Sequence, residues 1–167
     1  TIRTRLGNLG NILDEDPTQC DMLMLESPVL SNAEFAAMRA YMGDTVCTVD
    51  CTWPVADGET GLRRAIERIR REAEEGVRSG CAHVILTDEG QGPDRAAIPM
   101  ILAVGGVHTH LVRQSLRTFT SVNVRVAECI DVHTSAVLIG AGATTVNAYL
   151  AQESIADRHR RGLFGSM

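Results

Sequence analysis

The stretch LRRAIERIRREAEEGVRSGCAHVILTD, residues 62–88, decides the fold class of this chain. Apolar residues recur at helical spacing between charged faces, which predicts an amphipathic helix over residues 62–79. Gly80 predicts the end of that helix. The apolar run over residues 83–88 predicts a buried strand. A helix that leads through a glycine into a buried strand is part of a β-α-β unit.

The same pattern recurs on both sides of this stretch. Further strands are predicted over residues 46–52, 121–126 and 145–150, and further helices over 99–115, 131–139 and 154–161. Strand and helix therefore alternate four times, which predicts an α/β fold of four consecutive β-α units with a parallel sheet. Four such units form half of a TIM-like (β/α)8 barrel or one open doubly wound sheet, and the sequence leaves both interpretations open.

The first 30 residues differ from the rest. Glycine, asparagine, acidic residues and proline predict a loop-rich interdomain segment over residues 1–30. Ser31 and Glu34 form the pattern of a capping box, which predicts a helix that runs to Met42. The whole chain of 167 residues has the size of one domain, so we expect a single α/β domain with its core in residues 31–167.

Composition argues against several function classes. The net charge is −5 and all 16 basic residues are arginine, so lysine Schiff-base chemistry and a Walker-type phosphate loop are excluded. The acidic balance and the few aromatic residues argue against a nucleic-acid partner. No apolar run is long enough to cross a membrane. The five cysteines show no CxxC spacing, which favours reduced thiols in the cytoplasm.

No metal or cofactor site is expected in this chain. The cysteines are scattered, and His108 and His110 are two residues apart on a predicted helix, so they point to different faces. Gly90 and Gly92 lie in a loop after a strand, but without a GxGxxG pattern they are weak evidence for phosphate binding. We interpret that loop as structural.

Polar residues alternate with apolar residues along the predicted strands. Asp50, Arg125 and Asn147 fall on one face of the sheet, and Asp88 follows a strand at its carboxyl end. Strands that are buried on both faces are usually apolar throughout, so a polar face needs an explanation. The favoured interpretation is a buried salt network of Asp50 and Arg125 with Asp88 or Glu128. A ligand site and a contact with another domain are the alternatives.

Several segments resemble the central domain of the glutamate synthase large subunit, in the same order along nearly the whole chain. These segments are 4–13 (TRLGNLGNIL), 25–28 (LESP), 84–88 (VILTD), 98–100 (IPM), 103–105 (AVG), 108–113, 136–144 (AVLIGAGAT) and 147–151 (NAYLA). The resemblance implies a multidomain enzyme in which a glutaminase domain releases ammonia at an N-terminal cysteine. It further implies that ammonia passes through a tunnel to an FMN domain, where 2-oxoglutarate becomes glutamate.

The resemblance also implies an iron–sulfur cluster, electrons from NADPH or ferredoxin, and a small reductase subunit as a further partner. This sequence departs from the family pattern, because it begins with Thr1 rather than cysteine and has no cysteine cluster. We therefore expect a piece of a longer polypeptide that holds no catalytic residue and no cofactor of its own. The resemblance implies that the piece connects the glutaminase and FMN domains.

The glycine- and asparagine-rich segment near the start is the candidate for a tunnel wall or interdomain contact. Its proposed residues are Thr4, Gly7, Asn8, Gly10 and Asn11. Glycine allows the backbone to approach a neighbour closely, which suits a narrow wall. The alternative function is an autonomous small α/β enzyme or metabolite-binding domain. Its site would use Asp88, Arg125 and Asn147 at the carboxyl edge of the sheet.

Overall fold

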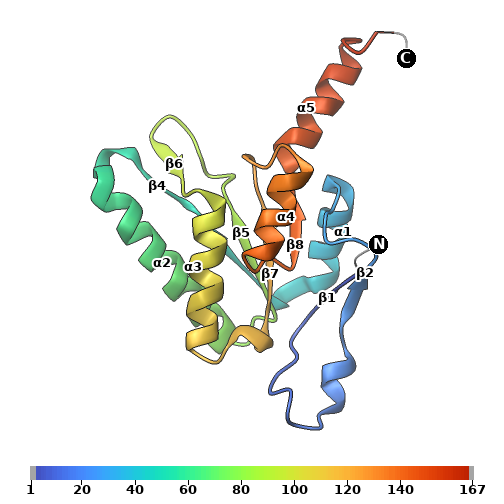
Figure 1. The fold of residues 1–167 in the computed structure, drawn as a ribbon, viewed down its shortest axis with the longest axis vertical. Coiled ribbons are helices and arrows are strands. Elements are labelled where there is room, and N and C mark those ends of the chain that lie inside the picture. Colours follow the sequence, from blue (N-terminus) through green and yellow to red (C-terminus); the bar gives the residue numbers. More distant parts are fainter. Residues whose placement is uncertain (1–2, 166–167) are drawn as a thin grey trace.

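The computed structural model describes residues 3–165, so Thr1 lies outside the described part, and its centre is a four-stranded parallel sheet (Figure 1). The strands lie in chain order: β3 (Val46–Asp50), β5 (His83–Thr87), β7 (Ser121–Arg125) and β8 (Thr145–Asn147). The connecting helices are α2 (Gly58–Arg78), α3 (Met100–Arg113) and α4 (Val132–Gly140). The predicted α/β class and the parallel sheet are confirmed.

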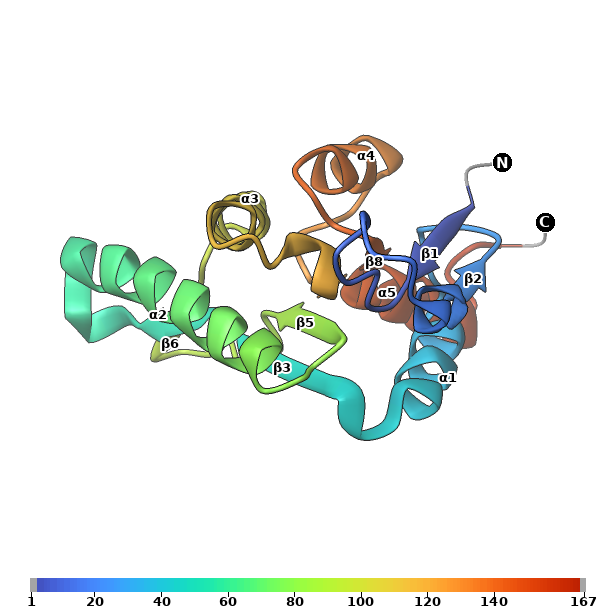
Figure 2. The same cartoon turned by 90° about the horizontal axis from the view of Figure 1, so that it is seen from below.

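The helices cover the two faces of the sheet unequally. Figure 2 shows α2, α3 and α4 on one face and α1 (Asn32–Met42) on the other. Strand order follows chain order without a reversal, and a doubly wound sheet would need such a reversal. The arrangement fits the predicted TIM-like half-barrel, and within residues 3–165 the sheet does not close into a barrel.

The larger core lies between the sheet and α2, α3 and α4. Alternate residues of the central strands, such as Val84, Leu86, Val122 and Val124, point to this face and are fully buried. Ile69 of α2 is one of the helix residues that meet them. Complete burial of each such aliphatic side chain contributes about 1.5–3 kcal/mol, so this face stabilises the whole unit.

A smaller core lies on the opposite face, under α1. Phe35, Met38 and Met42 pack on Ile85 of β5 together with residues from the first 30. The predicted capping box at the start of α1 is confirmed. The Ser31 hydroxyl accepts a hydrogen bond from the Glu34 amide at 3.2 Å, and the Glu34 carboxylate accepts one from the Ser31 amide at 2.7 Å.

The loop-rich N-terminal segment contains a sheet that we did not predict. Strand β1 (Thr4–Leu6) pairs antiparallel with β2 (Leu23–Leu25). The chain then runs beside β8, where the Leu30 amide donates to the Val146 carbonyl at 2.9 Å. The Val146 amide donates to the Pro28 carbonyl at 2.8 Å. These bonds cover the outer edge of β8 with the N-terminal segment.

The predicted strand over residues 46–52 is too long. Strand β3 ends at Asp50, and Thr52 begins β4 (Thr52–Pro54), which pairs antiparallel with β6 (Arg95–Ala97). Arg68 of α2 donates to the carbonyls of Asp50 and Thr52, at 2.8 and 2.9 Å. These bonds hold the chain in the turn where it leaves the main sheet.

The predicted strand over residues 145–150 is also too long. Strand β8 ends at Asn147, and Tyr149 already begins α5 (Tyr149–Arg160). The Asn147 amide donates to the Leu30 carbonyl at 3.1 Å and the Asn32 side chain at 2.9 Å, which anchors the strand end to α1. Helix α5 has no buried residue and projects from the body (Figure 1). No helix within residues 3–165 is both long enough and apolar enough to cross a membrane.

Candidate functional site

The α1 side of the sheet carries a chain of buried hydrogen bonds. The Thr145 hydroxyl donates to the Asn123 side-chain oxygen at 2.8 Å, and the Asn123 amide donates to the Ser121 hydroxyl at 2.9 Å. The Ser121 hydroxyl also lies 2.7 Å from Nδ1 of His83. Burial lowers the pKa of His83, so its ring is neutral near pH 7 and Nδ1 can accept a hydrogen bond from the Ser121 hydroxyl.

A serine next to a neutral histidine is the pair that nucleophilic catalysis needs, but an acidic partner must also orient the histidine. Within residues 3–165 no carboxylate hydrogen-bonds to His83. Both Ser121 and His83 are buried. The four side chains form a buried, hydrogen-bonded polar layer on this face of the sheet.

Arg125 is the centre of the carboxyl end of the sheet. Its Nε lies 2.8 Å from a Glu89 carboxylate oxygen, and one of its terminal nitrogens donates to the Asn147 side-chain oxygen at 2.7 Å. Its guanidinium carbon lies over the rings of Tyr149 and Phe35, at 4.7 and 5.5 Å from the ring centres. The guanidinium thus holds β7, β8, α1, α5 and the loop after β5 together.

Asp88 has a different partner. Its two carboxylate oxygens accept hydrogen bonds from the Ala127 amide, at 3.1 and 2.9 Å. Burial raises the pKa of Asp88, and the Ala127 hydrogen bond opposes that rise. Asp88 therefore fixes the chain where it leaves β7.

Asp50 is also separate from Arg125. It forms an ion pair with Arg95 at 2.7 Å and accepts hydrogen bonds from the amide and hydroxyl of Thr52. Asp50 and Arg125 therefore form ion pairs with different partners and are not joined in one salt network. Of the proposed residues of the polar face, the structure brings only Arg125 and Asn147 into direct contact.

The proposed tunnel residues lie in β1 and the loop that follows it. The Thr4 hydroxyl donates to the Thr144 carbonyl at 3.2 Å. Asn8 and Asn11 stabilise local turns, since their side-chain oxygens accept hydrogen bonds from the amides of Gly10 and Leu13. With Gly10, the two asparagines line a small cavity of about 260 Å³.

Gly7 lies apart from those turns. Its φ of +145° is rare for other residues, and a Cβ there would come within 2.7 Å of the Met22 sulfur. Gly7 lines a second cavity, of about 390 Å³, at the amino-terminal end of the sheet. The proposed tunnel segment thus borders two cavities rather than one.

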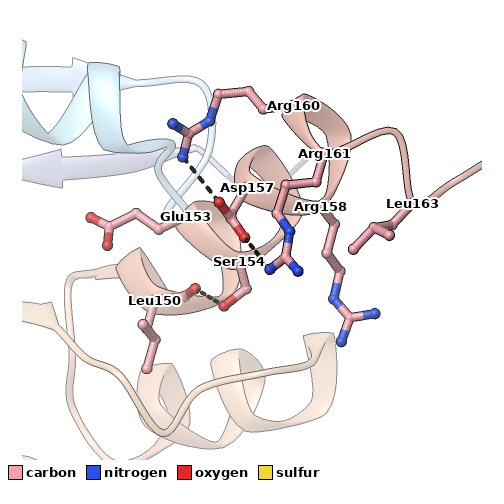
Figure 3. Close-up of a pocket in the computed structure, with 8 residues that line it drawn as sticks. All are labelled: Leu150, Glu153, Ser154, Asp157, Arg158, Arg160, Arg161 and Leu163. Carbon is pink, nitrogen blue, oxygen red and sulfur yellow. Dashed lines mark hydrogen bonds and ion pairs between the residues drawn. The ribbon is translucent and has the colours of Figure 1, made fainter.

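A hollow of about 630 Å³ lies along the projecting helix α5 (Figure 3). In it, Arg160 and Arg161 each lie 3.4 Å from Asp157. Ser154 donates to the Leu150 carbonyl at 2.7 Å, as Figure 3 shows. These ion pairs are exposed, so they contribute little free energy.

The comparison with known families gives one match over almost the whole chain. A family model described as the glutamate synthase central domain matches residues 1–166. The chain belongs to this family. The segments that carried the resemblance therefore identified the family correctly.

Individual relatives of this glutamate synthase central domain support the same family assignment. The chain is 69% identical over all its 167 residues to the NADPH glutamate synthase large chain of Azospirillum brasilense. It is 35% identical over 160 residues to the ferredoxin-dependent chloroplastic glutamate synthase of spinach. It is 33% identical over 162 residues to the NADH glutamate synthase of Saccharomyces cerevisiae. The chain spans 11%, 10% and 8% of the lengths of these three relatives, so it corresponds to a small part of each.

Proposed function

We propose that this chain is the connecting domain of a glutamate synthase. It would lie between a glutaminase domain and an FMN synthase domain and form part of the wall of the ammonia tunnel. The observation that carries the proposal is the 69% identity over the full chain to a large chain of which it spans only 11%. Glutamate synthesis from glutamine and 2-oxoglutarate would be the activity of the whole polypeptide.

Two apolar projections at opposite ends of the long axis support a connecting role. One is the loop after β1, where the side chains of Ile12 and Leu13 are 67% and 86% exposed. The other is α5, which projects at the other end (Figure 1). Its side chains of Leu150 and Ile155 are exposed. Exposed apolar side chains that lie next to one another can form part of a surface that binds a partner. Two such surfaces, far apart, suit a domain with a neighbour at each end.

We place the redox cofactors of that enzyme outside this chain. The names of the relatives include NADPH, NADH and ferredoxin as electron donors, and either NADPH or ferredoxin would suit the parent enzyme. Within residues 3–165, no three His, Cys, Asp or Glu side chains gather as metal ligands would. The donor set of an iron–sulfur cluster is therefore not provided by the described residues. FMN, the cluster and a small reductase subunit would belong to the rest of a cytoplasmic enzyme.

Gly10 gives a direct test of the tunnel wall in the intact enzyme. Gly10 has a φ of +58°, and a Cβ there would meet only the Asn8 oxygen, at 3.9 Å. Gly10→Leu therefore adds bulk to the loop, and its Cβ would have no contact shorter than 3.9 Å within the described residues. We expect the ratio of glutamine hydrolysed to glutamate formed to rise above that of the wild type, with free ammonia released.

Gly43 provides the matched control. It has a φ of +54°, and a Cβ there would meet no atom within 4 Å, so Gly43→Leu also places a leucine at a positive φ, at the end of α1. Its ratio of glutamine hydrolysed to glutamate formed should equal that of the wild type. Equal ratios in the Gly10 and Gly43 variants would contradict a tunnel role for this loop.

The alternative of an autonomous enzyme has less support. Arg125 and Asn147, two of its three proposed site residues, already bind each other. Mass spectrometry of the native protein distinguishes the two functions, because a connecting domain must occur in a polypeptide many times larger than 18.0 kDa. A native chain of that small size would overturn the proposal and favour the carboxyl edge as an independent site.

A further inference from the structure

The cavity at the amino-terminal end of the sheet has an unusual lining. Its walls come from β1 and the loop after it, from the segment before β7, and from the turn between α4 and β8. Its lining includes two arginines and four hydroxyl residues, and no aspartate or glutamate: Arg5, Arg117, Thr118, Thr120, Ser121 and Thr144. The lining is therefore cationic and rich in hydroxyl groups.

Among residues 3–165, no carboxylate forms an ion pair with Arg117. Its guanidinium donates to the Thr120 carbonyl at 2.7 Å, the Gly142 carbonyl at 3.0 Å, Nδ1 of His108 at 3.0 Å and the Thr144 hydroxyl at 3.5 Å. All four acceptors are neutral. Burial and the adjacent Arg117 lower the pKa of His108, as expected for a ring that accepts a hydrogen bond from a cation. Partly buried guanidinium groups are usually balanced by an anion.

Arg5 is the second cation at this cavity. It lies on β1, is exposed, and forms no side-chain hydrogen bond or ion pair with any residue in the range 3–165. Its neighbour on the same strand, Arg3, is paired with Glu26 at 3.2 Å and does not line the cavity. Arg5 is thus free to close on whatever occupies the space in front of Arg117.

We propose that this cavity binds a small oxyanion, a carboxylate or a phosphate, between Arg5 and Arg117. The guanidinium of Arg5 presents a planar fork of N–H donors that matches both kinds of oxyanion. The guanidinium of Arg117 already donates within the fold and contributes mainly its positive charge. The volume of about 390 Å³ lies within the range of about 300–1,000 Å³ that is typical of small-molecule sites. The oxyanion could be a free ion or metabolite, or a carboxylate from elsewhere in the same polypeptide.

The test uses the full native polypeptide and three arginine variants. Inorganic phosphate and succinate are titrated calorimetrically into the wild type, Arg5→Gln and Arg3→Gln. If the oxyanion is free, the wild type and Arg3→Gln bind one probe saturably, and Arg5→Gln binds it about tenfold more weakly or worse. Arg5→Lys, which keeps the charge but not the fork, should fall between the wild type and Arg5→Gln.

A carboxylate from elsewhere in the polypeptide, the second possible source of the oxyanion, gives a different result. If a carboxylate of the polypeptide fills the cavity, neither probe binds, but Arg5→Gln lowers the melting temperature more than Arg3→Gln does. High salt should remove that difference, because it screens the ion pair. The proposal is overturned if the two variants behave alike in both measurements. Equal stabilisation of every variant by phosphate would reflect only the general effect of an excluded salt, and it would also overturn the proposal.

Discussion

Two arginines bracket strand β7, and their surroundings differ. Arg125, at the carboxyl end, has the carboxylate of Glu89, the side-chain oxygen of Asn147 and two aromatic rings. Arg117, just before the amino end, has only neutral acceptors. Both hold neighbouring segments together, but only the charge of Arg125 is balanced within the described residues. The arginine at the carboxyl end of the strand thus has its charge paired with a carboxylate, whereas the arginine at the amino end has hydrogen bonds but no such pairing among the described residues.

The comparison separates geometry from charge. The guanidinium of Arg117 satisfies backbone carbonyls, which explains its place in the fold without explaining its charge. A neutral donor could form some of the same hydrogen bonds to these carbonyls. We therefore expect the two arginines to differ in how much the fold depends on them and in how they respond to salt and pH.

The largest effect is expected for Arg125→Met. This change removes the ion pair with Glu89 and the stacking on Tyr149, and it leaves the buried Asn147 oxygen without its donor. The free energy of unfolding of the 167-residue chain should fall by about 2–4 kcal/mol, measured by urea denaturation. Arg125→Lys should recover only part of that loss. A fall below about 1 kcal/mol would show that Arg125 is an ordinary surface ion pair.

A smaller effect is expected for Arg117→Met. The carbonyls of Thr120 and Gly142 lose a donor, but the fold no longer holds an unbalanced charge, so the two changes partly offset each other. Urea denaturation should give a loss of about 1–2 kcal/mol. In the wild type the contribution of Arg117 should change with added anions, whereas that of Arg125 should not. A loss equal to that of Arg125→Met would remove the distinction between the two sites.

The smallest effect is a dependence of stability on pH. The pKa of His108 is lowered in the folded state from its ordinary value of 6.5. Below pH 6.5, His108 therefore binds a proton more readily in the unfolded chain than in the folded one. Stability is fully present above pH 6.5 and is lost as pH falls toward the folded pKa, by at most about 1.4 kcal/mol per pH unit for one group. His83 contributes in the same direction because of its burial.

Arg117→Met should reduce this pH dependence, since Arg117 is one cause of the low pKa of His108. Urea midpoints between pH 7 and 5.5 would measure the slope. Arg125→Met is the matched control and should leave the slope unchanged. If neither variant alters it, the pH response belongs to His83 or to groups outside this site.

Periodicity predicted most of the fold, because the main sheet is built from local patterns. The helical spacing of residues 62–79 and the alternation of residues 121–126 each reflect one buried face, which the sequence shows directly. The ends of the strands were less predictable. Tyr149 and Leu150 continue the alternation of β8, but Asn147 binds residues near α1, and the chain becomes helical. That contact joins positions more than a hundred residues apart.

The candidate sites were less predictable than the fold. Asp50 and Arg125 share a sheet face, as alternation indicates, but their partners come from elsewhere. Arg95 and Glu89 lie in the segment that follows β5, where no periodicity tells which side chain returns to the sheet. The sequence around Arg117 did not indicate a binding site, since a single arginine after a helix resembles any basic helix end. Only the packing of the turn between α4 and β8 shows that its charge is enclosed.

The sheet follows chain order from β3 to β8, so each strand can join the edge left by the strand before it while the chain is being synthesised. The N-terminal segment cannot dock in this way. Thr4 contacts the carbonyl of Thr144, 140 residues later, and Leu30 hydrogen-bonds to Val146. These contacts need β8, which leaves the ribosome after the rest of the sheet. Within this stretch, residues 4–30 are therefore synthesised before β8, the strand that they contact, and they can dock only after it has formed.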